Sequence, residues 1–173
     1  MAPVNNLYRL IAVIVLLYVG AYPVYGQQSQ PANMQWYDFE EASRLSIEYE
    51  KDLFLFMEAD WCGICKRMHH EVFTDSTIQS LLSTYFYPVR IDIESKEKLT
   101  FNGQRMTSKA FSKKMKMNAT PTAIFLQPDH IVIGSKPGFM DVIELSVLLK
   151  YIQSDAWERT SLGEYRDSIS VNQ

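Results

Sequence analysis

The chain has 173 residues, 47% of them hydrophobic, and carries 20 acidic against 17 basic side chains, a formal net charge of −3. This length suits one ordinary domain with a substantial core and requires no second domain. The acidic balance argues against a nucleic-acid partner, which would require a basic face.

The N-terminal segment differs in composition from everything after it. Arg9 is its only charged side chain, and an apolar run from Leu10 to Val19 follows. This pattern is typical of a secretory signal peptide, with small residues suited to cleavage at Ala21 or Gly26. The run is shorter than the ~20 residues of a membrane span, and a retained membrane anchor is the alternative. Both interpretations predict a protein of the periplasm or another extracytoplasmic compartment.

The remaining chain alternates between two kinds of pattern. Apolar spacing of three and four residues predicts helices at 39–50, from Cys62 to about Glu71, from Asp75 through Leu82, from Thr107 or Ser108 through Met115, and from Asp141 through Ile152. Apolar or alternating runs predict strands at 53–57, 87–93, 122–126 and 131–133. Asn102-Gly103 marks a turn, and Gly134 and Gly138 are interpreted as bracketing a loop. The pattern predicts an α/β fold with a central mixed sheet flanked by helices.

These elements suggest a division of the chain into four parts. We assign a signal peptide or anchor at 1–26, a polar linker at 27–37, one folded domain at 38–154 and a C-terminal tail at 155–173. The tail contains Trp157, Leu162 and Tyr165, enough apolar surface to dock partly on the domain. A group of lysines between 109 and 116 follows a helical pattern, and we interpret it as a solvated surface.

Both cysteines of the chain lie in the stretch Trp61-Cys62-Gly63-Ile64-Cys65-Lys66, between a predicted strand and a predicted helix. A disulfide that closes so short a loop removes little entropy from the unfolded chain, so reversible redox chemistry explains the pair better than stabilisation. Unpaired N–H groups and the helix dipole favour a thiolate at a helix start. We therefore expect Cys62 to be the reactive sulfur and Cys65 to resolve mixed disulfides.

The cysteine pair is also compatible with functions other than redox chemistry. A structural disulfide is possible in an exported protein. A metal such as copper could be bound by the two sulfurs with His69 and His70, although one helix does not easily aim four ligands inward. Haem attachment is excluded because Lys66, not His, follows Cys65.

Several motifs together resemble the thioredoxin superfamily. They are the Trp-Cys-x-x-Cys-Lys stretch at a helix start, Thr120-Pro121-Thr122 before a strand, and a glycine before the last helix. The resemblance covers about Phe39 to Gln153. More narrowly, residues 58–62, 73–75 and 138–141 resemble the periplasmic C-terminal thioredoxin-like domain of the DsbD electron transporter and soluble SoxW-like thioredoxins.

The resemblance implies a thioredoxin-like fold and a thiol-disulfide oxidoreductase that needs no cofactor or metal. It implies that Trp61, Thr120 and Pro121 bind substrate, with Pro121 a cis-proline opposite the cysteines. X-Pro is also the only bond for which the cis form is inexpensive. The expected partners are disulfide-containing proteins and a membrane-delivered thiol electron donor, and the protein is expected to be a monomer.

The chain also departs from the superfamily pattern. Many thioredoxins carry a buried Asp six residues before the first cysteine, where this chain has Phe56. Glu58 and His69 are the candidates in sequence for proton transfer instead. No histidine lies between the cysteines to stabilise a thiolate, and its absence favours a reductant.

Overall fold

The computed structural model describes residues 34–170, so the predicted signal peptide and most of the linker lie outside the described residues. Its helices are α2 (Phe39–Tyr49), α3 (Gly63–Glu71), α4 (Ser76–Tyr85), α5 (Ser108–Lys114), α6 (Val142–Gln153), a short 3₁₀ helix η1 (Ala156–Glu158) and α7 (Leu162–Ser170). Its strands are β1 (Asp52–Glu58), β2 (Phe86–Asp92), β3 (Lys98–Phe101), β4 (Gln104–Thr107), β5 (Thr122–Leu126) and β6 (Val132–Pro137).

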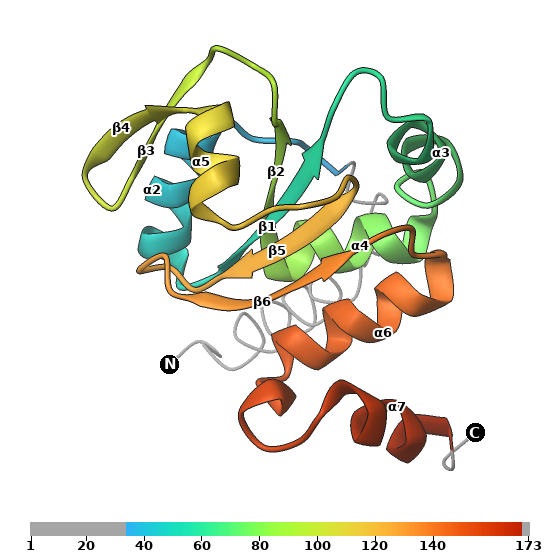
Figure 1. Ribbon diagram of the computed structural model, residues 1–173. Helices are drawn as coiled ribbons and strands as arrows, with labels where there is room; N and C mark the ends of the chain where they lie inside the picture. Colours follow the sequence, from blue (N-terminus) through green and yellow to red (C-terminus); the bar gives the residue numbers. More distant parts are fainter. Residues whose placement is uncertain (1–33, 171–173) are drawn as a thin grey trace, which may run out of the picture.

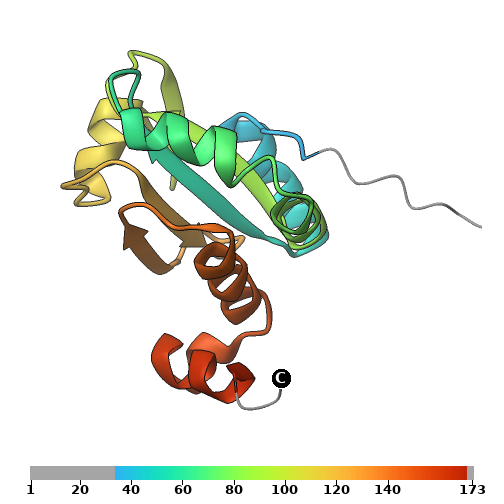
Figure 2. The same ribbon diagram turned by 90° about the vertical axis from the view of Figure 1, so that its right-hand side faces the viewer.

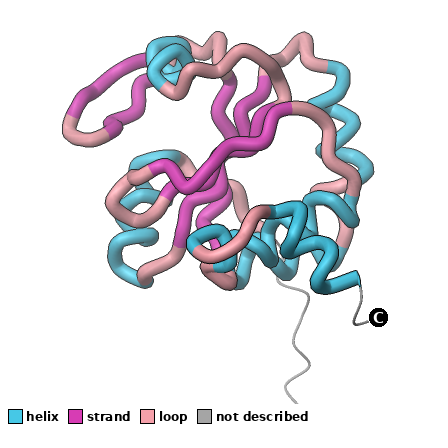
Figure 3. The backbone as a smooth tube through the Cα atoms, turned by 60° about the horizontal axis from the view of Figure 1, so that its bottom comes forward, coloured by secondary structure: helices cyan, strands magenta, loops and turns pink. Residues whose placement is uncertain are grey.

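Four strands form the central sheet in the order β2-β1-β5-β6 (Figure 1). β1 and β2 are parallel, whereas β5 is antiparallel to both of its neighbours, β1 and β6. The sheet is therefore mixed, as the sequence predicts. Figure 3 shows these strands passing through the middle of the domain between helices, with the β3–β4 hairpin outside the main sheet.

The sheet separates two hydrophobic cores because side chains alternate along β1. Phe54 and Phe56 point into the core built with α3, α4 and α6. Leu53, Leu55 and Met57 point into the core on the opposite face, which α2, α5 and β3 complete. All five side chains are fully buried, so this strand is apolar on both faces, as expected for a central strand between two helical layers.

Side-chain caps start the helices where the sequence predicts them. Asp38, Asp75 and Thr107 each accept a hydrogen bond from a backbone N–H in the first turn of the helix that follows. Asp141 does the same for α6, and Glu144 completes a reciprocal capping box there. Each such cap stabilises a helix by about 1 kcal/mol.

Two local predictions differ from the structure. The segments around Asn102-Gly103 are strands β3 and β4, which the sequence analysis described only as a turn. β6 continues to Pro137, so the prediction that Gly134 and Gly138 bracket a loop is wrong for Gly134. Gly134 pairs with Phe125 in the β5–β6 ladder, next to a register shift that short apolar patterning does not reveal.

The C-terminal tail packs on the domain beyond α6 (Figure 2). Trp157 and Leu162 contact the core that α6 covers. Tyr151 of α6 donates a 2.6 Å hydrogen bond to the Thr160 carbonyl and lies against the ring of Tyr165. Within residues 34–170, no helix combines the length and the apolar character needed to span a bilayer.

Candidate active site

The cysteine pair lies at the junction of β1 and α3. Cys62 is the N-cap residue of α3, and its sulfur accepts the Cys65 backbone N–H at 3.1 Å. The two residues form a disulfide with a Cα–Cα distance of 5.3 Å. A sulfur at this place receives the unpaired N–H groups and the positive dipole end of the helix, and both favour its thiolate form once the bond is reduced.

The surroundings of the pair leave one side open to a substrate. Cys62 retains 4% of its surface and Cys65 1%, whereas their neighbours Trp61 and Ile64 are 65% and 52% exposed. A Cβ placed on Gly63 would meet no atom within 4 Å. A substrate can therefore approach Cys62 over Trp61 and Gly63, while Cys65 is covered.

The loop before β5 reaches the same end of the sheet. Met57 pairs with Thr122 in the β1–β5 ladder, so Pro121 lies next to the end of β1, just before the cysteines. The Thr120–Pro121 bond is cis, and the Pro121 carbonyl accepts the Gly138 N–H at 2.8 Å. Thr120 and Trp61 line one cleft of about 350 Å³. The structure thus brings the predicted substrate-binding residues together beside the cysteine pair.

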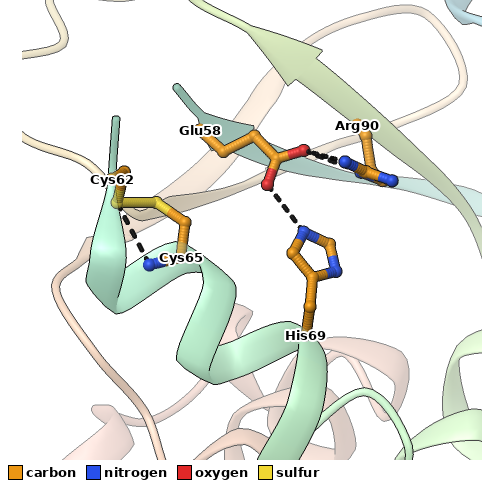
Figure 4. Close-up of polar contacts among 5 residues, drawn as sticks. All are labelled: Glu58, Cys62, Cys65, His69 and Arg90. Carbon is orange, nitrogen blue, oxygen red and sulfur yellow. Dashed lines mark hydrogen bonds and ion pairs between the residues drawn. A yellow bond between two sulfur atoms is a disulfide. The ribbon is translucent and has the colours of Figure 1, made fainter. Parts of the chain in front are cut away.

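Glu58 lies at the end of β1, where its carboxylate contacts the side chains of His69 and Arg90 (Figure 4). One carboxylate oxygen is 2.6 Å from His69 Nε2, and the other accepts a 2.7 Å hydrogen bond from Arg90 Nε. Glu58 is 8% exposed. The predicted proton-transfer pair, Glu58 and His69, is therefore in direct contact, and Figure 4 shows it on the same side of α3 as the disulfide.

The partners of Glu58 decide its charge. Burial raises the pKa of this carboxyl, but the hydrogen bonds and positive charges of His69 and Arg90 outweigh burial and leave the pKa below its ordinary value. Glu58 is therefore a carboxylate at neutral pH, able to accept a proton or hydrogen bond but not to donate one. Whether it takes part in proton transfer stays a prediction.

The metal-binding alternative finds no support in the arrangement of the helix. His69 is bonded to Glu58, and His70 is exposed on another face of α3. Among residues 34–170 no group of three or more His, Cys, Asp or Glu side chains is arranged to hold a metal ion.

Sequence reasoning missed four residues around the cysteines. Arg90 contacts Glu58, and Glu94 accepts a 3.0 Å hydrogen bond from the Trp61 indole N–H. Lys109 and Lys113 of α5 line the cleft opposite Trp61. Arg90 is the one basic residue in β2, a signal that could have identified it. The other three residues become neighbours of the cysteines only in the folded chain.

Comparisons with known proteins agree with this geometry. A family profile described as a thioredoxin-like domain matches residues 39–153. A curated relative, an uncharacterized protein of Archaeoglobus fulgidus, is 30% identical over 87 residues, covering 50% of this chain and 65% of the relative. The chain thus matches less than two thirds of that relative's length.

Solved structures are similar across most of the domain. A thioredoxin-fold protein from Helicobacter pylori has a TM-score of 0.62 at 15% identity, covering 72% of this chain and 88% of that chain. A Bacteroides thetaiotaomicron protein with the provisional name of a disulphide-isomerase has a TM-score of 0.57 at 25% identity, covering 77% and 99%. The first likeness shows the fold alone.

Proposed function

The chain belongs to the thioredoxin-like domain family, and from this membership we propose that it is an exported thiol-disulfide oxidoreductase that reduces disulfides of proteins or small molecules. The observation that carries the proposal is the place of Cys62, whose sulfur caps α3 beside an open cleft. A cysteine used only for cross-linking would gain little from this position.

The proposed reaction transfers two electrons from the cysteine pair to the substrate. The Cys62 thiolate attacks one sulfur of the substrate disulfide, that disulfide breaks, and the other substrate sulfur leaves as a thiolate. The Cys65 thiolate then attacks Cys62 in the mixed disulfide and releases the second substrate thiolate. The pair is left as the disulfide that the structure contains.

Reduction in this direction requires a supply of electrons. The residues between the cysteines, Gly63 and Ile64, offer no side-chain charge or imidazole to stabilise a Cys62 thiolate strongly, and this favours a reductant over a strong oxidant. Outside the cytoplasm the pair must be re-reduced, and we propose a thiol electron donor delivered through the membrane. The protein acts as a monomer on protein disulfides.

The test is insulin reduction with dithiothreitol as the electron source, using the wild type and two matched serine variants. We expect turnover by the wild type and none by Cys62→Ser. Cys65→Ser, reduced beforehand and then freed of dithiothreitol, should accumulate mixed disulfides with insulin. Equilibration of the wild type with glutathione then reports the reduction potential and the direction of the reaction. A wild type that reduces no disulfide, together with a Cys65→Ser protein that traps nothing, would show that the pair is structural.

A further inference from the structure

Positive charge is concentrated in one part of this net acidic chain. Seven of its 17 basic residues fall between positions 96 and 116, where Glu97 is the single acidic residue. All seven are exposed, and none forms an ion pair with another described residue. The sequence analysis interpreted the lysines of this region as a solvated surface, but the fold places two of them at the active site.

Lys109 and Lys113 are one helical turn apart on α5 and line the cleft of about 350 Å³ that Trp61 and Thr120 line as well. Lys109 and Lys113 belong to the basic stretch at 96–116, Trp61 directly precedes Cys62, and Thr120 lies on the loop before β5. A segment bound in this cleft would contact both lysines while its cysteine lies near Cys62.

The remaining lining of the cleft is largely apolar. Ile93, Met117 and Ala119 provide surface against which the chain of a bound segment can pack. Glu94 is the one acidic side chain in the lining, and its carboxylate accepts the indole N–H of Trp61. The cleft therefore combines an apolar lining with an excess of positive charge that faces the substrate.

We propose that this cleft binds an acidic segment of the protein substrate, with Asp or Glu next to the cysteine that Cys62 attacks. The inference rests on the proposed function and adds its substrate class. Charges at the edge of a binding site mainly accelerate encounter and discriminate between partners. The chain as a whole is net negative, but seven of its 17 basic residues lie in this one stretch, so an acidic segment is drawn toward the cleft that Lys109 and Lys113 line.

The test uses two disulfide-linked peptides that differ only in whether Glu or Lys flanks the cysteine on both sides. We expect the wild type to show a kcat/KM about five- to tenfold higher for the acidic peptide at low ionic strength, from two or three partly exposed charge pairs. The preference should disappear in 1 M salt, where charges are screened within about 3 Å.

Matched double variants separate the cleft from the overall charge. In the double variant Lys109→Glu with Lys113→Glu, the ratio of kcat/KM for the acidic peptide to kcat/KM for the basic peptide should fall to one or below. Lys96→Glu with Lys98→Glu makes the same change in net charge outside the cleft lining and should keep most of the preference. Both peptides are measured with the same preparation of each variant. A lower fraction of folded protein then reduces both kcat/KM values equally and leaves their ratio unchanged.

Two results would overturn the inference. The wild type could reduce both peptides equally, or the two double variants could lose the preference to the same extent, which would assign it to overall charge. Neutral 2-hydroxyethyl disulfide separates failure of the inference from failure of the function. Reduction of that compound without peptide preference refutes only the substrate class, whereas no reduction of any disulfide refutes the oxidoreductase and the inference with it.

Discussion

His69 Nε2 lies 2.6 Å from the Glu58 carboxylate, one helical turn after Cys65. Arg90 binds the other carboxylate oxygen, so Glu58 is held between two donors. An ionised carboxylate can only accept, and the Nε2 atom of His69 therefore carries the hydrogen. This contact orients the imidazole and leaves its Nδ1 atom free to exchange protons. The imidazole of His69 can both accept and donate a proton, whereas the Glu58 carboxylate can only accept one, so His69 is the better candidate to move a proton at this site.

Replacement of Glu58 tests the carboxylate itself. We expect Glu58→Gln to lower the free energy of unfolding by about 1–3 kcal/mol at pH 7, because Arg90 loses its charged partner. The pKa of Glu58 is lowered in the folded state, so its contribution is present above the ordinary value of 4.5 and is lost as the pH falls through the folded pKa. Urea denaturation at pH 7 and pH 3.5 measures both effects.

Glu71→Gln is the matched control for this substitution. Glu71 pairs with Arg67 on the same helix as His69, but both side chains are more than half exposed. Such a surface pair contributes about 0.5 kcal/mol or less. Two outcomes would contradict a stabilising role for the ionised Glu58 carboxylate. One is an equal loss of unfolding free energy in the two variants, and the other is a loss for Glu58→Gln that is as large at pH 3.5 as at pH 7.

A second prediction concerns proton transfer by His69. His69→Gln retains a donor for Glu58 but removes the imidazole, and we expect mixed-disulfide resolution by Cys65 to slow about tenfold or more at pH 7. Acid quenching of the mixed disulfide with a model substrate measures this step. His70→Gln, on the exposed side of α3, should resolve at the wild-type rate. Identical resolution rates for the two variants would remove His69 from the mechanism.

Local signals were sufficient for the elements that carry the cysteines. The apolar run before Trp61 and the lack of a helix breaker after Cys65 predict the strand and the helix, and the resemblance to thioredoxins supplied Pro121. Arg90 could not be paired with Glu58 in the same way. Their contact depends on the parallel register of β1 and β2, which puts Phe56 opposite Arg90 and Glu58 two positions on. The sequence of neither strand alone determines the register between them.

The β3–β4 hairpin was missed for a different reason. Its strands are four residues each, and only Leu99 and Phe101 of β3 are buried, so they lack the apolar runs that mark the core strands. Asn102 and Gly103 both have positive φ angles, 49° and 74°, the geometry of the tight hairpin turn that Asn-Gly favours. This dipeptide was the available signal, and a stricter interpretation of it predicts strands on both sides.

A third prediction concerns Asp52 at the start of β1, far along the strand from the cysteines. Burial, with a smaller effect from Asp155, raises the pKa of Asp52 to about 6. The folded state then binds more protons than the unfolded state between pH 3.8 and about 6, so this group lowers stability as the pH rises. Asp52→Asn should raise the free energy of unfolding by about 1 kcal/mol or less at pH 7.5, given the partial exposure of the group, and change it little at pH 4.

Thermal or urea unfolding at the two pH values measures the effect of Asp52→Asn. Asp155→Asn is the control, because asparagine tolerates the positive φ of 52° at this position. This substitution removes the charge near Asp52 and should raise the free energy of unfolding by a smaller amount than Asp52→Asn. A gain at pH 4 that equals the gain at pH 7.5 would mean that desolvation of the charge is not its cause.

The last prediction concerns His130, which connects three segments at the end of the sheet opposite the cysteines. Its Nε2 atom is 3.0 Å from Ser43 Oγ of α2, and its Nδ1 atom is 3.1 Å from Asn102 Oδ1 in the β3–β4 turn. Its ring stacks on Phe101 at 5.3 Å.

Burial lowers the pKa of His130, against a smaller opposing effect of Asp129. As the pH falls through the ordinary value of 6.5, the unfolded chain takes up a proton that the folded ring does not, so the protein loses stability. The loss can reach at most about 1.4 kcal/mol per pH unit. His130→Asn, which suits the positive φ of 67°, should have a flatter stability curve between pH 7.5 and 5, whereas His70→Asn should follow the wild type. Parallel curves for all three would show that His130 is not the titrating group. A flatter curve for His130→Asn alone would assign the loss of stability in acid to His130, whose ring lies against the β3–β4 turn.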